Sequence, residues 1–220
     1  DECELHPKKA TLMNVEGTRN IAHAANEVGA HVVHISTDFI FDGKDGPYKE
    51  DALAQPLSHY GWTKLEAEEI IQELPSWSIL RTVLVIGMAE DLSRSNIVLW
   101  AKGALEKGQA INVVDDQYRT PTLAEDLAQG ALLAADQCAQ GVFNISGPDF
   151  MSIYDLVGQV AEHFGLSMAS VTRTDSTTLN QPAKRPPRTG FDISKARKEL
   201  GYKPHSFKEA LEIIANQAGL

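Results

Sequence analysis

In the N-terminal part of the chain, an amphipathic segment is followed closely by a mostly apolar one. Between residues 7 and 28, apolar side chains recur near helical spacing, which predicts one long helix. Pro7 suits the first turn of that helix, and Gly29 suits its C-terminal cap. The next residues, HVVHIST (31–37), are mostly apolar and β-branched, as is typical of a short buried strand.

The same order of helix and strand recurs further along the chain. After a polar loop over residues 42–56, Ser58 is suited to cap a helix that extends from about residue 59 to residue 74. WSILRTVLVIG (77–87) then predicts a second buried strand. Helices and strands that alternate with such short links favour a parallel sheet with right-handed crossovers, so we expect an α/β fold.

Beyond residue 87 the pattern is less regular but still mixes helices and strands. Helical periodicity covers residues 95–108, 123–136, 152–165, 194–202 and 206–217, and short apolar strands are expected at 111–114 and 141–147. Residues 172–190 show no periodicity. We therefore expect a second, smaller α/β unit that packs over the first.

Charge and cysteine content narrow the classes of function. The formal net charge of −10 disfavours nucleic acid as a general partner, because a phosphate backbone requires a basic face. Two cysteines are too few for a disulfide framework, so a reducing cytoplasm is the expected location. No apolar run is long enough for a membrane span, so no membrane partner is expected, and no metal site is predicted.

The strongest candidate for chemistry is a tyrosine and a lysine spaced four residues apart on the predicted helix. A lysine ammonium one turn from a phenol favours the phenolate, so Lys64 is expected to lower the pKa of Tyr60. Thr37 ends the preceding strand, where parallel sheets build their sites. Together the three groups could protonate a carbonyl while a hydride reaches its carbon. The same spacing also arises by chance in surface helices, and Asp38 could be an ordinary turn residue.

The pattern around these residues resembles a known family. Residues 31–68, HVVHISTDFIFDGKDGPYKEDALAQPLSHYGWTKLEAE, resemble the extended short-chain dehydrogenase/reductases. They are most similar to the dTDP-4-dehydrorhamnose reductase branch, with its S-T-D, F-x-G, P-Y-x-E and Y-G-x-x-K elements. The segments ILRT, DDQYRTPTLAEDLA, GVFNISG and KRPPRTGFDISKARKELGY extend the resemblance over nearly the whole chain.

The resemblance implies the C-terminal part of a Rossmann-like, doubly wound parallel sheet with a smaller α/β substrate-binding domain. Residues 1–90 would form a partial dinucleotide-binding domain to which residues 113–140 return, and residues 91–112 and 141–220 would form the smaller domain. The implied cofactor is NADPH or NADH, and the implied substrate is a nucleotide-linked sugar. The oligomeric state stays open, with a homodimer as one option.

The resemblance also implies roles for individual side chains. Tyr60 would donate a proton to the 4-keto oxygen of the sugar, Lys64 would bind the nicotinamide ribose, and Thr37 would polarise the carbonyl. The implied cofactor contacts are Ser36, Tyr60, Lys64, Thr82 and Val83. The implied substrate contacts are Asp38, Arg119 and Arg185. A guanidinium fork matches phosphate oxygens, although a solvated surface position is the alternative for Arg185.

Three positions depart from the pattern of the family. Phe39 stands where the related 4,6-dehydratases have a glutamate, so dehydration is not expected. Leu84 stands where the reductases usually have a tryptophan, and Arg119 stands where they usually have a glycine and epimerases an arginine. We therefore expect an NAD(P)H-dependent reductase of a nucleotide-linked 4-keto sugar. The alternatives are an NDP-sugar epimerase and a non-catalytic subunit similar to the regulatory subunit of methionine adenosyltransferase.

The glycine-rich cofactor loop of the family, G-x-x-G-x-x-G, has no counterpart in this sequence. By the resemblance, Asp1 falls just after the fourth strand, so about 60 residues that carry the loop are expected to precede it. Such a loop holds the pyrophosphate against backbone amides at a helix N-terminus. We therefore predict that these 220 residues bind NADH and NADPH more weakly by several kcal/mol than a chain with the loop. Titration calorimetry measures this, and micromolar affinity would contradict it.

Overall fold

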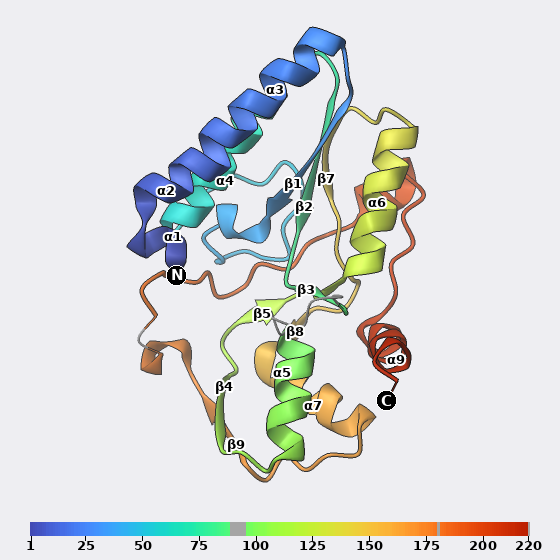
Figure 1. Cartoon of the computed structure of the whole chain (residues 1–220). Coiled ribbons are helices and arrows are strands. Elements are labelled where there is room, and N and C mark those ends of the chain that lie inside the picture. The colour runs from blue at the N-terminus through green and yellow to red at the C-terminus, as the bar shows by residue number, and fades with distance from the viewer. Residues whose placement is uncertain (89–95, 180, 220) are drawn as a thin grey trace.

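The sheet that carries the predicted site residues forms the upper part of the computed structural model in Figure 1. The structure describes residues 1–88, 96–179 and 181–219. The sheet has three strands in the order β1-β2-β7, with parallel pairings throughout, and they are β1 (Val32–Thr37), β2 (Trp77–Thr82) and β7 (Gly141–Asn144). Thr37 lies opposite Thr82, so the carboxyl ends of β1 and β2 meet at one edge. The expected α/β fold with a parallel sheet is confirmed.

The long N-terminal helix forms as predicted, with one irregular turn. Its segments are α2 (Pro7–Thr11), the π-helical η1 (Leu12–Glu16) and α3 (Gly17–Val28), and the short α1 (Glu2–Leu5) precedes it, separated by the non-helical backbone of His6. The backbone stays in the right-handed helical region at Leu12 and at Glu16, so residues 7–28 are one continuous helix. Gly29 ends this helix with a φ of 66°, a conformation that glycine adopts without strain.

The helix that carries Tyr60 lies unusually close to the end of β1. Helix α4 (His59–Gln72) begins after Ser58, whose hydroxyl oxygen accepts a hydrogen bond from the Gly61 amide at 3.3 Å, as the predicted cap requires. A β-carbon added to Gly61 would come within 2.2 Å of the carbonyl oxygen of Phe39. The glycine therefore lets the first turn of α4, with Tyr60, approach the carboxyl end of β1.

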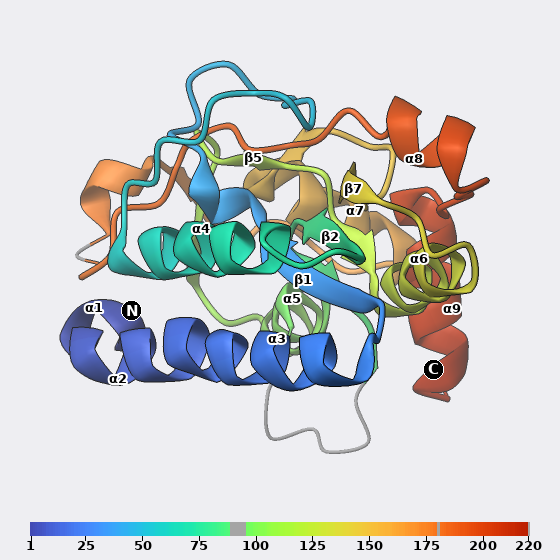
Figure 2. The ribbon, with the colours of Figure 1, turned by 90° about the horizontal axis from the view of Figure 1, so that it is seen from above.

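Helices cover both faces of the sheet, as Figures 1 and 2 show. On one face, α3 and α4 pack against Ile79 of β2. On the other face, α6 (Ala124–Asp136) and α8 (Ser194–Glu199) pack against Leu80 of β2. Ile79 and Leu80 point to opposite sides because side chains alternate along a strand. This two-sided arrangement places the carboxyl ends of β1 and β2 between the helical layers.

The lower part of the molecule in Figure 1 has its own apolar core. Its elements are α5 (Ile97–Glu106), β4 (Ile111–Val114), α7 (Ile153–His163), β9 (Val171–Thr174) and α9 (Phe207–Gln217), with β4 parallel to β9. Two short ladders lie between the parts, β3 (Val85–Ile86) with β6 (Thr122–Leu123) and β5 (Tyr118–Arg119) with β8 (Met151–Ser152). The remaining elements are the 3-10 helices η2 (Asp38–Ile40) and η3 (Ser176–Thr178). None of the helices in the described ranges combines the length and the apolar character that a membrane crossing requires.

The structure corrects several boundaries predicted for the second half. Residues 141–144 form β7 beside β2, so the smaller domain does not begin at residue 141. Strand β4 pairs with β9, so the return to the larger sheet does not begin at residue 113. The strand expected over residues 77–87 is interrupted at Leu84, whose φ is 38°. The predicted boundary at residues 90 and 91, like the predicted helix start at Ser95, falls outside the described residues.

The close approach at Gly61 gives a test of this packing. We predict that Gly61→Ala lowers the free energy of unfolding by about 1–3 kcal/mol, because the new methyl group meets the Phe39 carbonyl. Gly103→Ala is the matched control, since Gly103 also lies within a helix but has no atom within 4 Å of an added β-carbon. The control should gain about 0.5–1 kcal/mol from helix propensity. Urea denaturation measures both, and equal effects would contradict the packing.

Candidate active site

The strand β1 ends in a turn of buried polar residues. Ser36, Thr37 and Asp38 are 2%, 7% and 2% exposed. The Thr37 hydroxyl donates to Asp38 Oδ1 at 3.2 Å, and its oxygen accepts from the Phe39 amide at 3.2 Å. The second bond caps η2, so the Thr37 side chain is fixed from both sides.

Tyr60 lies against this turn. Its ring packs edge-to-face on Phe39, with the ring centroids 5.9 Å apart, and the Thr37 side chain lies near enough to the phenol to lower its pKa. Thr37 lowers the pKa of Tyr60, which is the effect of a hydroxyl that can donate to the phenolate oxygen. The structure therefore brings Thr37 and Tyr60 together, as expected from the sequence.

Lys64 does not act on Tyr60 as the sequence predicted. The pKa of Tyr60 is raised from its ordinary value, mainly by burial and also by Asp38 and Cys3. The Lys64 ammonium instead donates to the carbonyl oxygen of Ile35 at 2.7 Å. The spacing of four residues places Lys64 on the same helix, but its long side chain turns to β1, so the predicted lowering of the tyrosine pKa is wrong for this structure. Burial also lowers the pKa of Lys64 itself.

Of the other predicted cofactor contacts, Ser36 is the one with an unused polar group. Its buried hydroxyl has no hydrogen-bond partner among the described residues. Thr82 donates to the hydroxyl of Thr122 at 3.1 Å. The Val83 side chain is fully buried, and its carbonyl oxygen accepts from Thr122 at 2.6 Å. Ser36 is therefore the position where a bound polar group would satisfy a buried hydroxyl.

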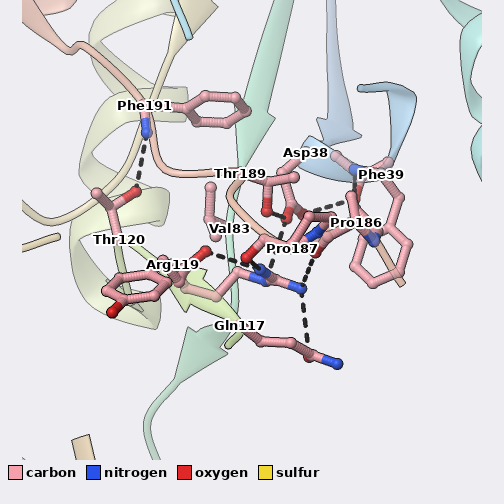
Figure 3. Close-up of polar contacts among 12 residues, drawn as sticks. Asp38, Phe39, Val83, Gln117, Arg119, Thr120, Pro186, Pro187, Thr189 and Phe191 are labelled. Carbon is pink, nitrogen blue, oxygen red and sulfur yellow. Dashed lines mark hydrogen bonds and ion pairs between the residues drawn. The ribbon is translucent and has the colours of Figure 1, made fainter. Parts of the chain in front are cut away.

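Asp38 and Arg119 form a buried pair that reaches the segment 186–189 (Figure 3). Arg119 Nε lies 3.6 Å from Asp38 Oδ2, and both side chains are at most 5% exposed. The Thr189 hydroxyl donates to the same carboxylate oxygen. Burial raises the pKa of Asp38, and Arg119 and Thr189 oppose that rise. The carboxylate is thus held by groups from three separate parts of the chain.

The guanidinium of Arg119 is used within the protein. It donates to the carbonyl oxygens of Tyr118 at 2.7 Å, Pro186 at 2.8 Å and Pro187 at 3.2 Å. The predicted substrate contact by Arg119 therefore competes with bonds that anchor the segment 186–189. Nothing in the local sequence indicates the bonds to Pro186 and Pro187, because these partners are backbone carbonyls far along the chain.

Arg185 differs from Arg119 in its exposure. Its side chain is 39% exposed, and its only ion pair among the described residues is a 3.9 Å contact with Asp1. Arg185 lines a cavity of about 170 Å³ together with Asp38, Phe39 and Arg119. The other lining residues are the polar Gln117 and Gln181 and the apolar Leu84, Ile97, Val114, Ile153 and Leu179. Such a cavity suits a ligand that combines an anionic group with an apolar or planar one.

Two other observations limit the location of a site. A larger hollow of about 430 Å³, lined by residues within 42–55, contains none of the predicted site residues. Within the described ranges, no three His, Cys, Asp or Glu side chains are grouped so as to hold a metal ion. The turn after β1 and the adjoining cavity are therefore the candidate site.

Comparison with known proteins finds one protein family and solved reductase structures that match nearly the full length of this chain. The profile of the family described as RmlD substrate binding domain matches residues 1–219. A dTDP-4-dehydrorhamnose reductase from Clostridium acetobutylicum is 31% identical, with a TM-score of 0.92 over 100% of this chain and 77% of that one. A dTDP-4-dehydrorhamnose reductase from Bacillus anthracis, solved in complex with NADP, is 25% identical, with a TM-score of 0.90 over 99% and 76% of the two chains.

The same comparison finds a relative of another functional class. Methionine adenosyltransferase 2 subunit beta from Xenopus laevis is 31% identical over 205 residues, which are 90% of this chain. The chain spans only 61% of the length of that relative. The family profile matches residues 1–219, and the parallel sheet and the position of Tyr60 beside Thr37 are consistent with that match. This chain belongs to the RmlD substrate-binding-domain family.

Proposed function

We propose that the protein is a reductase that delivers a hydride and a proton to the keto group of a nucleotide-linked 4-keto sugar. The packing of Tyr60 against Phe39, beside Thr37 at the carboxyl end of β1, is the observation that carries this proposal. The Tyr60 phenol is protonated at neutral pH, as a proton donor must be, and its raised pKa makes it a weak acid in this structure, so bound ligands would have to lower that pKa. Thr37 would hold the same carbonyl oxygen by turning its hydroxyl proton from Asp38 to the substrate.

NADPH or NADH would supply the hydride when it is bound. The unpartnered, buried hydroxyl of Ser36 fits a cofactor, because a ribose or carboxamide group could satisfy it. Lys64 retains one ammonium proton beyond those it directs at β1, and it would hold a ribose hydroxyl. Thr82 and Val83 would contribute the backbone wall of the site, since their polar groups already bind Thr122. The NADP complex of the Bacillus anthracis relative supports this assignment.

Part of the sugar nucleotide would occupy the cavity beside Phe39, since its volume of about 170 Å³ is too small for the whole ligand. Phe39 lines this cavity and touches Tyr60, so a sugar ring there would lie next to the phenol. Arg185, which is half-exposed, is the candidate partner for the diphosphate, whereas Arg119 and Asp38 would shape the wall. No carboxylate stands at position 39, so the site lacks the base that a dehydratase would use there.

A non-catalytic subunit is the second candidate function. The similarity to methionine adenosyltransferase 2 subunit beta favours it, and so does a group of exposed apolar side chains on the N-terminal helices. Leu12, Met13, Ile21 and Val28 are 62–78% exposed, which suits a protein partner. An epimerase is less favoured, because the arginine that suggested it, Arg119, already binds carbonyl oxygens of the protein.

The proton-donor role of Tyr60 predicts the effect of a single substitution. In protein that oxidises NADPH in the presence of a dTDP-linked 4-keto-6-deoxy sugar, Tyr60→Phe should lower kcat by about 100-fold or more, because only the hydroxyl is lost. Tyr154→Phe is the control, since Tyr154 is also partly buried but lies in α7. Nicotinamide absorbance follows turnover. Unchanged turnover in Tyr60→Phe would assign the proton to another group.

The proposed diphosphate contact predicts a loss of nucleotide affinity. Arg185→Met should weaken dTDP binding by about 10-fold or more, because a charge-assisted hydrogen bond is lost. The neighbouring cation Lys184 is exposed and does not line the cavity, so Lys184→Met should change the affinity little. Calorimetry with dTDP compares the two variants. Equal losses would point to a general effect of charge on this segment, and no loss in Arg185→Met would remove Arg185 from the site.

A further inference from the structure

The Lys64 ammonium is enclosed by two acceptors of the strand that ends at Thr37. Its Nζ donates to the Ile35 carbonyl oxygen at 2.7 Å and lies 3.3 Å from Nε2 of His34. Val32, two residues before His34, packs in the apolar cluster of α3 and α4, whereas Val33 packs in the cluster of α6 and α8. Alternation along the strand therefore turns His34 toward α4, which carries Lys64.

The chemistry of the two groups fixes the state of the histidine ring. An ammonium group has donors only, so Nε2 of His34 must accept the hydrogen bond. The ring must then be neutral, with its proton on Nδ1. Burial and, second, the Lys64 charge together lower the pKa of His34 to about 4, so the ring is neutral at neutral pH. The lowered pKa therefore agrees with a neutral ring, and the contact with Lys64 selects the tautomer with the proton on Nδ1.

The other charged groups near this contact are already paired. On α4, Glu68 lies one turn beyond Lys64 and partly offsets the lowering of the lysine pKa by burial. Its carboxylate is fully buried and binds Arg81 of β2 at 2.7 Å. Helix α6 packs on the opposite face of β1, beside Val33. His34 is thus the side chain of β1 that determines where the lysine ammonium lies.

We infer that His34 is a positioning residue, whose ring nitrogen holds the Lys64 ammonium so that its third proton is directed at a ligand. Within the described part of the chain, Lys64 makes no hydrogen bond beyond those to His34 and Ile35. With two donors fixed to β1, the remaining N–H has a defined direction. The role of Lys64 in cofactor binding rests on the proposed function. The contact between His34 and Lys64 does not depend on it.

The contact is tested without any assay of activity. Nitrogen-detected NMR of the ring should show His34 with its proton on Nδ1, and its pKa should rise in Lys64→Met, because a neighbouring positive charge is removed. His31 is the internal control, since its ring nitrogens contact Ser76 and Ser78 instead. Its pKa should not move in Lys64→Met. A proton on Nε2 of His34, or an unchanged His34 pKa, would overturn the inference even if the protein proves to be a reductase.

The positioning role is tested by a pair of substitutions. Gln at position 34 keeps an acceptor at the end of the side chain, and Leu removes it at similar volume. In the proposed reductase, His34→Leu should raise the KM for the cofactor by about 10-fold with a smaller change in kcat, and His34→Gln should recover most of the loss. Equal defects in both variants, with equal melting temperatures, would overturn the role. If the unaltered protein turns over no sugar, the proposed function fails and the ring tautomer still decides whether His34 holds Lys64.

Discussion

The buried carboxylate of Asp38 is the constraint on which the rest of the site depends. It stands at the end of β1 and is almost fully buried, so its charge needs partners. Thr37, Arg119 and Thr189 provide them, from the strand end, from β5 and from the segment 186–189. Removing one partner of a buried ion pair commonly costs about 3–5 kcal/mol, because the other charge stays buried and unpaired. The ion pair of Asp38 and Arg119 therefore holds β5 and the segment 186–189 against the end of β1, and a buried pair of this kind adds little net stability.

This constraint connects the two halves of the molecule through short polar links. Arg119 binds Asp38 on one side and the carbonyl oxygens of Pro186 and Pro187 on the other. The segment that carries Arg185 is thereby held beside the cavity, while Asp38 accepts the proton of the Thr37 hydroxyl and so holds that side chain near Tyr60. Gly61 completes the arrangement because its lack of a side chain lets α4 approach the turn. The site is thus built by contacts between residues distant in sequence.

Local patterns in the sequence predicted the elements that depend on local physics. Helical spacing and the cap at Ser58 gave α4, and the apolar run before Thr37 gave β1. The pattern could not predict that Lys64 binds β1 instead of acting on Tyr60, since that depends on the path of a long side chain. It also missed β9, because a half-exposed strand rich in Thr and Arg has no apolar alternation. Residues 186–189 are anchored through backbone carbonyl oxygens. Every residue has such an oxygen, so the sequence cannot indicate which of them bind Arg119.

The central claim is that this site transfers hydride to C4 of a keto sugar while Tyr60 supplies the proton. The most direct measurement uses NADPH that carries deuterium at the transferred position, with a dTDP-linked 4-keto-6-deoxy sugar, and analyses the product by NMR. The account predicts one deuterium at C4 of a newly formed alcohol, in step with the NADPH consumed. A sugar recovered without deuterium at C4, or one inverted without net consumption of NADPH, would contradict it.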